Sequence, residues 1–290
     1  MSTEDWVPAI INAIQKMSGN LDYLTHMTYL GLELEKHKMM KELRESPRYH
    51  DPRSLVPHGY KVYSQNEEDG IIREIFNRIG TANKVFVELG VGNGLENNTL
   101  TLLFENWRGL WIEGSPQNVE SIKNNFASTI SDGQLTVVCS YITKNNINAL
   151  VSSHLPDKEI DLLSVDVDGN DYHILECITS VDPRVIVIEY NGKFPPPIVF
   201  CMRYDERHVW DSTDKFGASL KFLELKLKER GYALVGCNLT GSNAFFVRQD
   251  LTADKFLEPF TAENHFEPAR YWLSVMTAGH PASYATLESR

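Results

Sequence analysis

The sequence predicts an α/β protein with a seven-stranded, mostly parallel sheet that ends in an antiparallel hairpin, preceded by N-terminal helices. Three observations support this fold. Short apolar stretches alternate with longer segments, the first five stretches are far enough apart for helical crossovers, and a glycine-rich loop follows the first of them. With 290 residues, 42% hydrophobic and 23% charged, the chain can bury a full core.

Two helices are expected before the sheet. Gly19-Asn20 is expected to separate two groups of apolar residues at helical spacing: Trp6, Ile10, Ile14 and Met17, then Leu24, Met27, Leu30 and Leu34. Prolines 47, 52 and 57 predict an extended connector. Ser64 to Glu67 has the form of a capping box and predicts a helix through Ile71, Ile72, Ile75 and Ile79 that ends near Gly80.

Seven strands are predicted from stretches rich in Val, Ile, Leu or aromatic residues: Lys84–Leu89, Gly109–Glu113, Leu135–Ser140, Asp161–Asp166, Val185–Tyr190, Tyr232–Cys237 and Ala244–Arg248. Only Asn238–Asn243 separates the last two, which is too short for a crossover, so they should form an antiparallel hairpin. The long segment Asn191–Ser219 suits an active-site flap before a helix over Ser219–Arg230. The tail after Leu251 should pack on the domain through Phe260, Phe266, Tyr271, Trp272 and Met276.

The composition favours small molecules over nucleic acid or membrane as binding partners. The formal charge is −11 and the chain has no run of Lys or Arg, which disfavours nucleic acid. Acidic residues stand where a signal peptide would be basic, and no apolar run has membrane length, so we expect a cytoplasmic protein without membrane contact. The four cysteines are far apart and suggest neither a disulfide framework nor a zinc site. A homodimer is compatible with the sequence.

The glycine loop predicts a cofactor. Gly90, Gly92 and Gly94 follow the first strand, where open parallel sheets bind ligands. A binding site for a nicotinamide dinucleotide typically has the motif G-x-G-x-x-G, whose backbone binds the pyrophosphate. Here the glycine spacing is shorter and Glu88 adds negative charge, which disfavours a pyrophosphate. S-adenosylmethionine (SAM) has an ammonium, a sulfonium and a ribose diol, which an acid would suit. Glu113 ends the next strand, where it could bind the ribose of either cofactor.

A second group of acids follows the fourth and fifth strands. Asp166 is the candidate for contacting the methionine ammonium of SAM or the acceptor nucleophile. Asp168 lies in a D-x-D-G-x-D fragment that is similar to a calcium loop, but the later bidentate acid is missing. Glu189 and Asn191 follow the next strand, so their oxygens should lie near Asp166.

These motifs resemble the class I SAM-dependent methyltransferases. The set SQNEEDGI, VFVELGVGNGLENNT, GLWIEGSP, LLSVDVDGND and VIVIEYN resembles the FkbM-like branch, over roughly Tyr63–Arg248. The resemblance implies a Rossmann-like sheet and SAM as cofactor, with contacts from Glu88, Gly90, Gly92, Gly94, Glu113 and Asp166. FkbM-like sequences commonly have Glu at the position of Asp168, which leaves its role open.

The resemblance also suggests a domain organisation: residues 1–60 as a helical extension or lid, 61–250 as the SAM-binding domain, and 251–290 as the tail. Asp166, Glu189 and Asn191 resemble the Mg²⁺ ligands of metal-dependent O-methyltransferases, with simple hydrogen bonding to nearby loops as the alternative. Asp166 and Glu189 are candidate bases, whereas none of the nine histidines forms a ligand pair. Tyr190 either faces the sulfonium or packs at a strand end.

Three functions follow. The first is methyl transfer from SAM to oxygen or nitrogen of a small natural product or sugar-derived metabolite. The second keeps the SAM site but cyclises SAM to azetidine-2-carboxylate and methylthioadenosine. The third is a non-catalytic subunit that binds a partner through its N-terminal helices.

Overall fold

In the computed structural model of the chain, residues 3–155, 157–274 and 282–288 are described. The chain forms two compact units, Met1–Ser46 and Pro47–Arg290. The first unit contains one helix, α1 (Thr3–Arg44), where two were expected. Gly19 and Asn20 remain helical because a single glycine in a helix costs only about 1 kcal/mol, which a helix of 42 residues tolerates.

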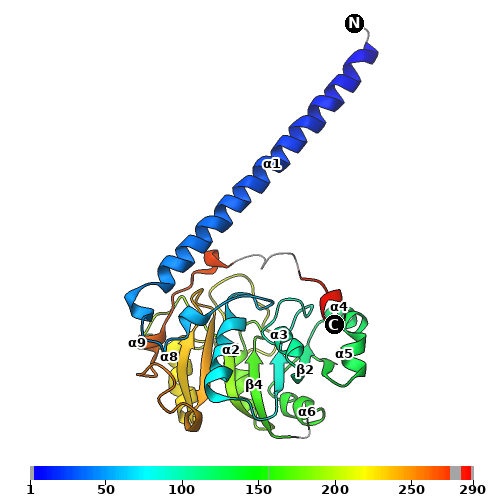
Figure 1. The fold of residues 1–290 in the computed structure, drawn as a ribbon. Helices are drawn as coiled ribbons and strands as arrows, with labels where there is room; N and C mark the ends of the chain where they lie inside the picture. The colour runs from blue at the N-terminus through cyan, green and yellow to red at the C-terminus, as the bar shows by residue number, and fades with distance from the viewer. Residues whose placement is uncertain (1–2, 156, 275–281, 289–290) are drawn as a thin grey trace. The chain divides into compact units, whose positions relative to one another are not determined.

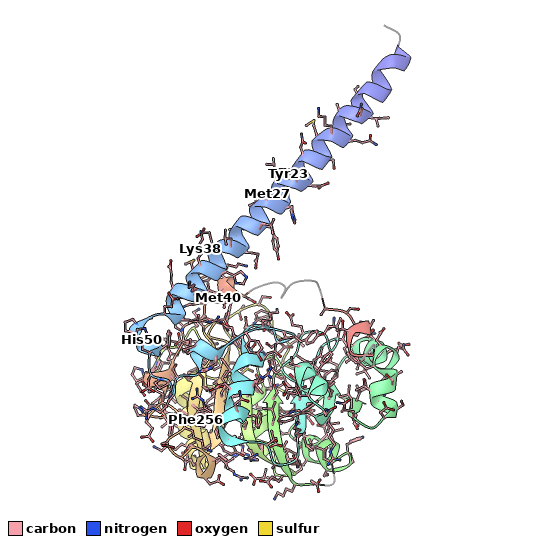
Figure 2. The ribbon with its side chains drawn as sticks, in the orientation of Figure 1. Tyr23, Met27, Lys38, Met40, His50 and Phe256 are labelled. Atoms are coloured by element: carbon pink, nitrogen blue, oxygen red, sulfur yellow. The ribbon has the colours of Figure 1, made fainter. Side chains whose placement is uncertain are left out.

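From Ile10 to Met39, most large apolar side chains of α1 are open to solvent. Tyr23 is 64% exposed and Met27 is 48% exposed (Figure 2). Phe256, in the second unit, is by contrast completely buried. No helix in the described part of the chain is long and apolar enough to cross a membrane.

The second unit is built on the predicted seven-stranded sheet (Figure 1). Its spatial order is β3-β2-β1-β4-β5-β7-β6. The first five strands are parallel, and β7 is antiparallel to both β5 and β6, which confirms the C-terminal hairpin. The strands are β1 (Val85–Leu89), β2 (Arg108–Glu113), β3 (Leu135–Cys139), β4 (Glu159–Val165), β5 (Asp182–Glu189), β6 (Tyr232–Cys237) and β7 (Asn243–Arg248).

Helices cover both faces of the sheet. One core packs α7 and α8 against side chains such as Val87 and Ile186, and the other packs α2, α3 and α4 against Phe86 and Val187. Successive residues of a strand face opposite layers, so a sheet covered on both sides is apolar on both. The helices are α2 (Glu68–Ile79), α3 (Leu100–Phe104), α4 (Pro116–Asn125), α5 (Ala127–Ser131), α6 (Ile147–Ser152), α7 (Asp171–Cys177), α8 (Leu220–Glu229), α9 (Ala262–His265) and α10 (Ala285–Glu288).

The start of α2 differs from the expected capping box. Ser64 does pair with the helix, but its Oγ accepts from the amide of Asp69, not from an amide near Glu67. The Asp69 carboxylate in turn accepts three backbone N–H groups, from Val62, Tyr63 and Ser64. A carboxylate can accept several amides at once, so Asp69 organises this turn in place of Glu67.

Single-turn 3₁₀ helices connect the larger elements at Pro47–Tyr49, Val56–His58, Gln249–Leu251 and Tyr271–Leu273. In the tail, Phe260 and Phe266 pack against the core, whereas Tyr271 and Trp272 are about half exposed. Met276, also expected to pack, lies outside the described residues.

Candidate active site

The glycine loop lies at the carboxyl end of β1, where it turns tightly towards the end of β4. Gly90, Gly92 and Gly94 all have positive φ, between 54° and 79°. A Cβ atom on Gly90 would lie 1.8 Å from the backbone oxygen of Asp166. At Gly92 a Cβ atom would meet nothing within 4 Å. Glycine is therefore required in this loop, with a close approach of two backbones as its main cause at Gly90.

Glu113 binds the glycine loop from the end of β2. One carboxylate oxygen accepts the amide of Gly92 at 2.9 Å and the other accepts the amide of Ser115 at 2.8 Å. Each oxygen keeps a free lone pair. Glu113 thus fixes the loop and can still accept a hydrogen bond from a ligand.

A first cavity of about 360 Å³, here called the glycine-loop cavity, opens beside these residues. Its walls come from the ends of β1, β2, β3 and β4. They consist of Gly90, Ile112, Glu113, Gly114, Ser115, Ser140, Tyr141, Ile142, Asp166, Val167, Asp168 and Asn170. The Tyr141 hydroxyl donates to the backbone oxygen of Glu206 at 3.0 Å, which holds its ring at the cavity wall.

A second cavity of about 350 Å³, here called the aromatic cavity, lies over the ends of β4 and β5. It is lined by Gln65, Asn66, Asp166, Asp168, Glu189, Trp210, Phe216, Ser242, Tyr271 and Ser274. Asp166 and Asp168 line both cavities, so the two spaces meet at these side chains. Among the described residues, no Lys, Arg or His lines either cavity.

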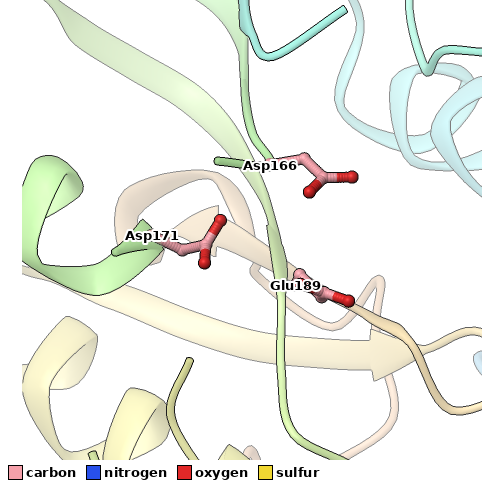
Figure 3. A group of neighbouring side chains, drawn as sticks. All are labelled: Asp166, Asp171 and Glu189. Atoms are coloured by element: carbon pink, nitrogen blue, oxygen red, sulfur yellow. The ribbon is translucent and has the colours of Figure 1, made fainter. Parts of the chain in front are cut away.

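Three carboxylates gather where the cavities meet (Figure 3). Asp166 follows β4, Asp171 begins α7 and Glu189 ends β5, and one oxygen of each lies within 4.8 Å of the others. Burial raises the pKa of Asp166 and of Glu189 well above the usual range, and repulsion from neighbouring carboxylates adds to the shift. Burial also raises the pKa of Asp171 to about 6.

The three carboxylates differ in how far they are already satisfied. Asp171 accepts the amides of Val167 at 2.8 Å and Gly169 at 2.9 Å, so it shapes the turn after β4. Asp166 accepts a backbone hydrogen bond from Asp168. Glu189 accepts no hydrogen bond from any residue that the structure describes.

Glu88 does not reach either cavity, contrary to the expectation that it contacts the cofactor. It is buried and accepts from the amide of Asn98 at 2.8 Å and from the hydroxyl of Thr99. Glu88 and Phe86 are two residues apart on β1, so their side chains face the same side of the sheet. The helices α2, α3 and α4 cover that side, so Glu88 points into this layer and away from the glycine loop. Burial raises the pKa of Glu88 to about 7.

Tyr190 and Asn191 also face away from the expected site. Tyr190 is completely buried, and its hydroxyl donates to the backbone oxygen of Glu267. This is the packed aromatic of the two alternatives. The Asn191 amide nitrogen donates to the backbone oxygens of Asp214 and Phe216, and its oxygen accepts the amide of Lys193. Asp171, not Asn191, joins Asp166 and Glu189.

Several residues of the site were missed at the sequence level. Asp171 could have been found, since it is the last acid of the D-x-D-G-x-D fragment. Trp210 and Phe216 lie in the segment expected to form a flap, but nothing in their spacing marks them. Tyr271 lies in the tail, and only the folding of that tail over the end of β5 brings it to the cavity.

The geometry fits the expected cofactor. The open space beside Gly92 would let SAM approach the backbone closely. Glu113 has free lone pairs for the ribose hydroxyls, and Asp166 provides an acidic wall for the ammonium of SAM. The expected Mg²⁺ set of Asp166, Glu189 and Asn191 fits less well, because a loop holds both the nitrogen and the oxygen of the Asn191 side chain. Asp171, which takes its place beside the other two acids, is held by two amides.

The strand order 3-2-1-4-5-7-6, with a glycine loop at the end of β1, is the one expected for the class I SAM-dependent methyltransferase fold. Residues 83–234, more than half of the chain, match the model of the methyltransferase FkbM domain. The chain therefore belongs to the FkbM methyltransferase family. Among curated proteins, none matches this chain.

Two of the solved structures that are similar to this chain are described as methyltransferases. One is a Staphylococcus aureus protein provisionally assigned as a caffeoyl-CoA O-methyltransferase, with 14% identity over 74% of this chain and 99% of that chain, at a TM-score of 0.44. A SAM-dependent methyltransferase from Aquifex aeolicus has 14% identity over 72% of this chain and 95% of that chain, at a TM-score of 0.39.

Proposed function

We propose that this enzyme transfers the methyl group of SAM to an oxygen or nitrogen of a small molecule bound in the aromatic cavity. The observation that carries the proposal is that two cavities of similar volume meet at Asp166 and Asp168. Methyl transfer is an in-line displacement, so it needs donor and acceptor on opposite sides of one short path. Two spaces with a shared wall supply that arrangement.

The glycine-loop cavity is the proposed cofactor site. Glu113 would accept hydrogen bonds from the ribose hydroxyls, Tyr141 and Ile142 would pack against the adenine, and Asp166 would face the ammonium. When bound, SAM supplies an electrophilic methyl group on a positively charged sulfur. The carboxylates at the junction lower the electrostatic cost of holding that charge in a partly buried site.

The aromatic cavity is the proposed acceptor site. Asp166 and Glu189 are the candidate bases that would take a proton from the acceptor nucleophile, because burial raises the pKa of both carboxyls and so makes each a stronger base. Trp210, Phe216 and Tyr271 provide apolar surface that orients the acceptor and limits water. A cavity of this size and lining suits a small metabolite such as a natural product or sugar derivative.

Product analysis tests this function. Purified full-length protein is incubated with SAM, with and without a metabolite extract, and the nucleoside product is identified. S-adenosylhomocysteine that forms only with extract is the expected result. Methylthioadenosine that forms without an acceptor would instead establish SAM cyclisation to azetidine-2-carboxylate. An absence of both turnover and SAM binding would point to a non-catalytic subunit.

A further inference from the structure

The aromatic cavity combines three acids with an aromatic wall. Asp166, Asp168 and Glu189 line it, and among the described residues no basic side chain does. Trp210 and Tyr271 are each about half exposed. An anionic acceptor such as a phosphorylated or carboxylated metabolite would be repelled here, because like charges in a partly buried site are costly.

Glu189 is the acid at this wall to which no described residue donates. Its carboxylate lines the cavity and accepts no hydrogen bond from the described residues, although an oxygen of Asp166 lies within 4.8 Å. Two neighbouring carboxylates repel each other unless a proton or another cation lies between them. Glu189 is half-buried at the cavity wall, so water screens this repulsion only in part. A ligand with a positively charged donor would relieve the repulsion.

The aromatic side chains favour an organic cation over a metal ion. The Trp210 indole N–H donates to the backbone oxygen of Thr213 at 2.9 Å, which fixes the orientation of the ring. Its ring packs edge-on against Phe216, with centroids 6.3 Å apart. Ring faces attract ammonium groups and offer no ligand to Mg²⁺. Burial, together with the charge of Glu189, raises the pKa of Tyr271 to about 12, so its hydroxyl stays a neutral donor.

We propose that the acceptor is an amine, which enters the aromatic cavity as an ammonium ion between Glu189, Asp166 and the ring of Trp210. This inference rests on the proposed methyl transfer and names its acceptor class. The ammonium gives one proton to a carboxylate, and the freed nitrogen pair forms the N–CH₃ bond. The CH₃–S bond breaks, and its electron pair stays on sulfur. S-adenosylhomocysteine, the N-methylammonium product and one protonated carboxyl result, and that proton then leaves to water.

Paired probes test the acceptor class by calorimetry on the full chain saturated with S-adenosylhomocysteine. Benzylamine is compared with benzyl alcohol, and glucosamine with glucose, because each pair differs in ammonium against hydroxyl. We expect at least one amine to bind about tenfold or more tightly than its alcohol. Glu189→Gln should remove this preference, and Trp210→Leu should weaken the amine several-fold. Glu120→Gln, at an exposed position on α4, is the matched control and should change nothing.

The outcomes separate this inference from methyl transfer itself. Equal or tighter binding of both alcohols, or no amine binding at millimolar concentration, would overturn the amine acceptor while SAM turnover could still stand. The amine acceptor would also be overturned if Mg²⁺ alone binds the wild-type protein, excludes benzylamine and fails to bind Glu189→Gln. If the protein does not bind S-adenosylhomocysteine, methyl transfer fails, and the same probes are titrated into the free protein to test the cavity.

Discussion

The backbone oxygen of Asp166 lies 1.8 Å from the point where a Cβ atom on Gly90 would stand. The ends of β1 and β4 are held in this contact by the ladder, since the amide of Asp166 donates to the oxygen of Leu89 at 3.1 Å. The same contact brings the glycine loop next to the acidic turn. A side chain at position 90 would therefore disturb both cavities at their junction.

Gly90→Ala should lower the free energy of unfolding and abolish SAM binding. Gly133→Ala is the matched control, because Gly133 also has a positive φ, 73° against 76°, but its Cβ atom would meet nothing within 4 Å. We expect about 1–2 kcal/mol for the control, from the backbone conformation alone. Gly90→Ala should cost about 1–3 kcal/mol more, from the clash. Urea unfolding and SAM titration measure both, and equal costs would show that the contact relaxes easily.

Glu113→Gln should weaken SAM binding by about tenfold to a hundredfold, because a charge-assisted hydrogen bond contributes about 1.5–3 kcal/mol. Part of this loss could come from the glycine loop, which Glu113 also holds through Gly92. A 2′-deoxy analogue of S-adenosylhomocysteine separates the two contributions in a double-mutant cycle. If Glu113 binds the ribose, the variant should lose little affinity for the analogue. An equal loss for both ligands would restrict Glu113 to holding the loop.

Glu88 predicts a pH dependence of stability. Its pKa rises from 4.5 to about 7 on folding, so between these pH values the folded state binds a proton that the unfolded state has lost. Stability due to this group is therefore greatest below pH 4.5 and falls until about pH 7. The loss is on the order of 3 kcal/mol. Subtracting the unfolding free energy of Glu88→Gln from that of wild type should reveal this fall, and a difference that stays flat from pH 4.5 to 8 would contradict it.

Tyr190→Phe tests whether Tyr190 is a packed core residue and not part of the reaction centre. The variant loses a buried hydrogen bond to the backbone oxygen of Glu267, which should cost about 0.5–1.5 kcal/mol of stability. Affinity for SAM and turnover should stay within about twofold, since the ring does not line either cavity. A large drop in kcat with unchanged stability would return Tyr190 to the reaction centre. Tyr271→Phe, at the aromatic cavity, gives the comparison.

Much of the fold could be predicted from the sequence. Strand boundaries agree to within about three residues because each strand is a short apolar run between turn-forming segments. The proximity of Asp166 and Glu189 was also predictable, since parallel pairing places Val165 opposite Ile188 and their next residues at one edge. The prediction of two N-terminal helices was wrong, because the sequence around Gly19 does not show whether a long helix can tolerate the free-energy cost of one glycine.

The errors in the site have a common cause. Glu88, Tyr190 and Asn191 are next to the crevice in sequence but face into layers or loops. Strand ends can be located from periodicity, whereas the direction of a side chain at a strand end depends on which helices and loops cover it. Trp210 and Tyr271 show the opposite case: they are far from the strand ends in sequence, but the segments that carry them cover the strand ends, so both line the same cavity.

The sequence by itself determined the parallel sheet, the glycine loop and the acids at the ends of β2, β4 and β5, because these depend on local spacing and on the geometry of parallel strands. Only the tertiary structure decided which acids face open space and which chemistry surrounds them. Asp171 and Glu189 illustrate this, since amides two and four residues before Asp171 satisfy it, whereas no described residue donates to Glu189. The cavity that Glu189 faces is walled by segments far apart in the chain, which no local pattern encodes.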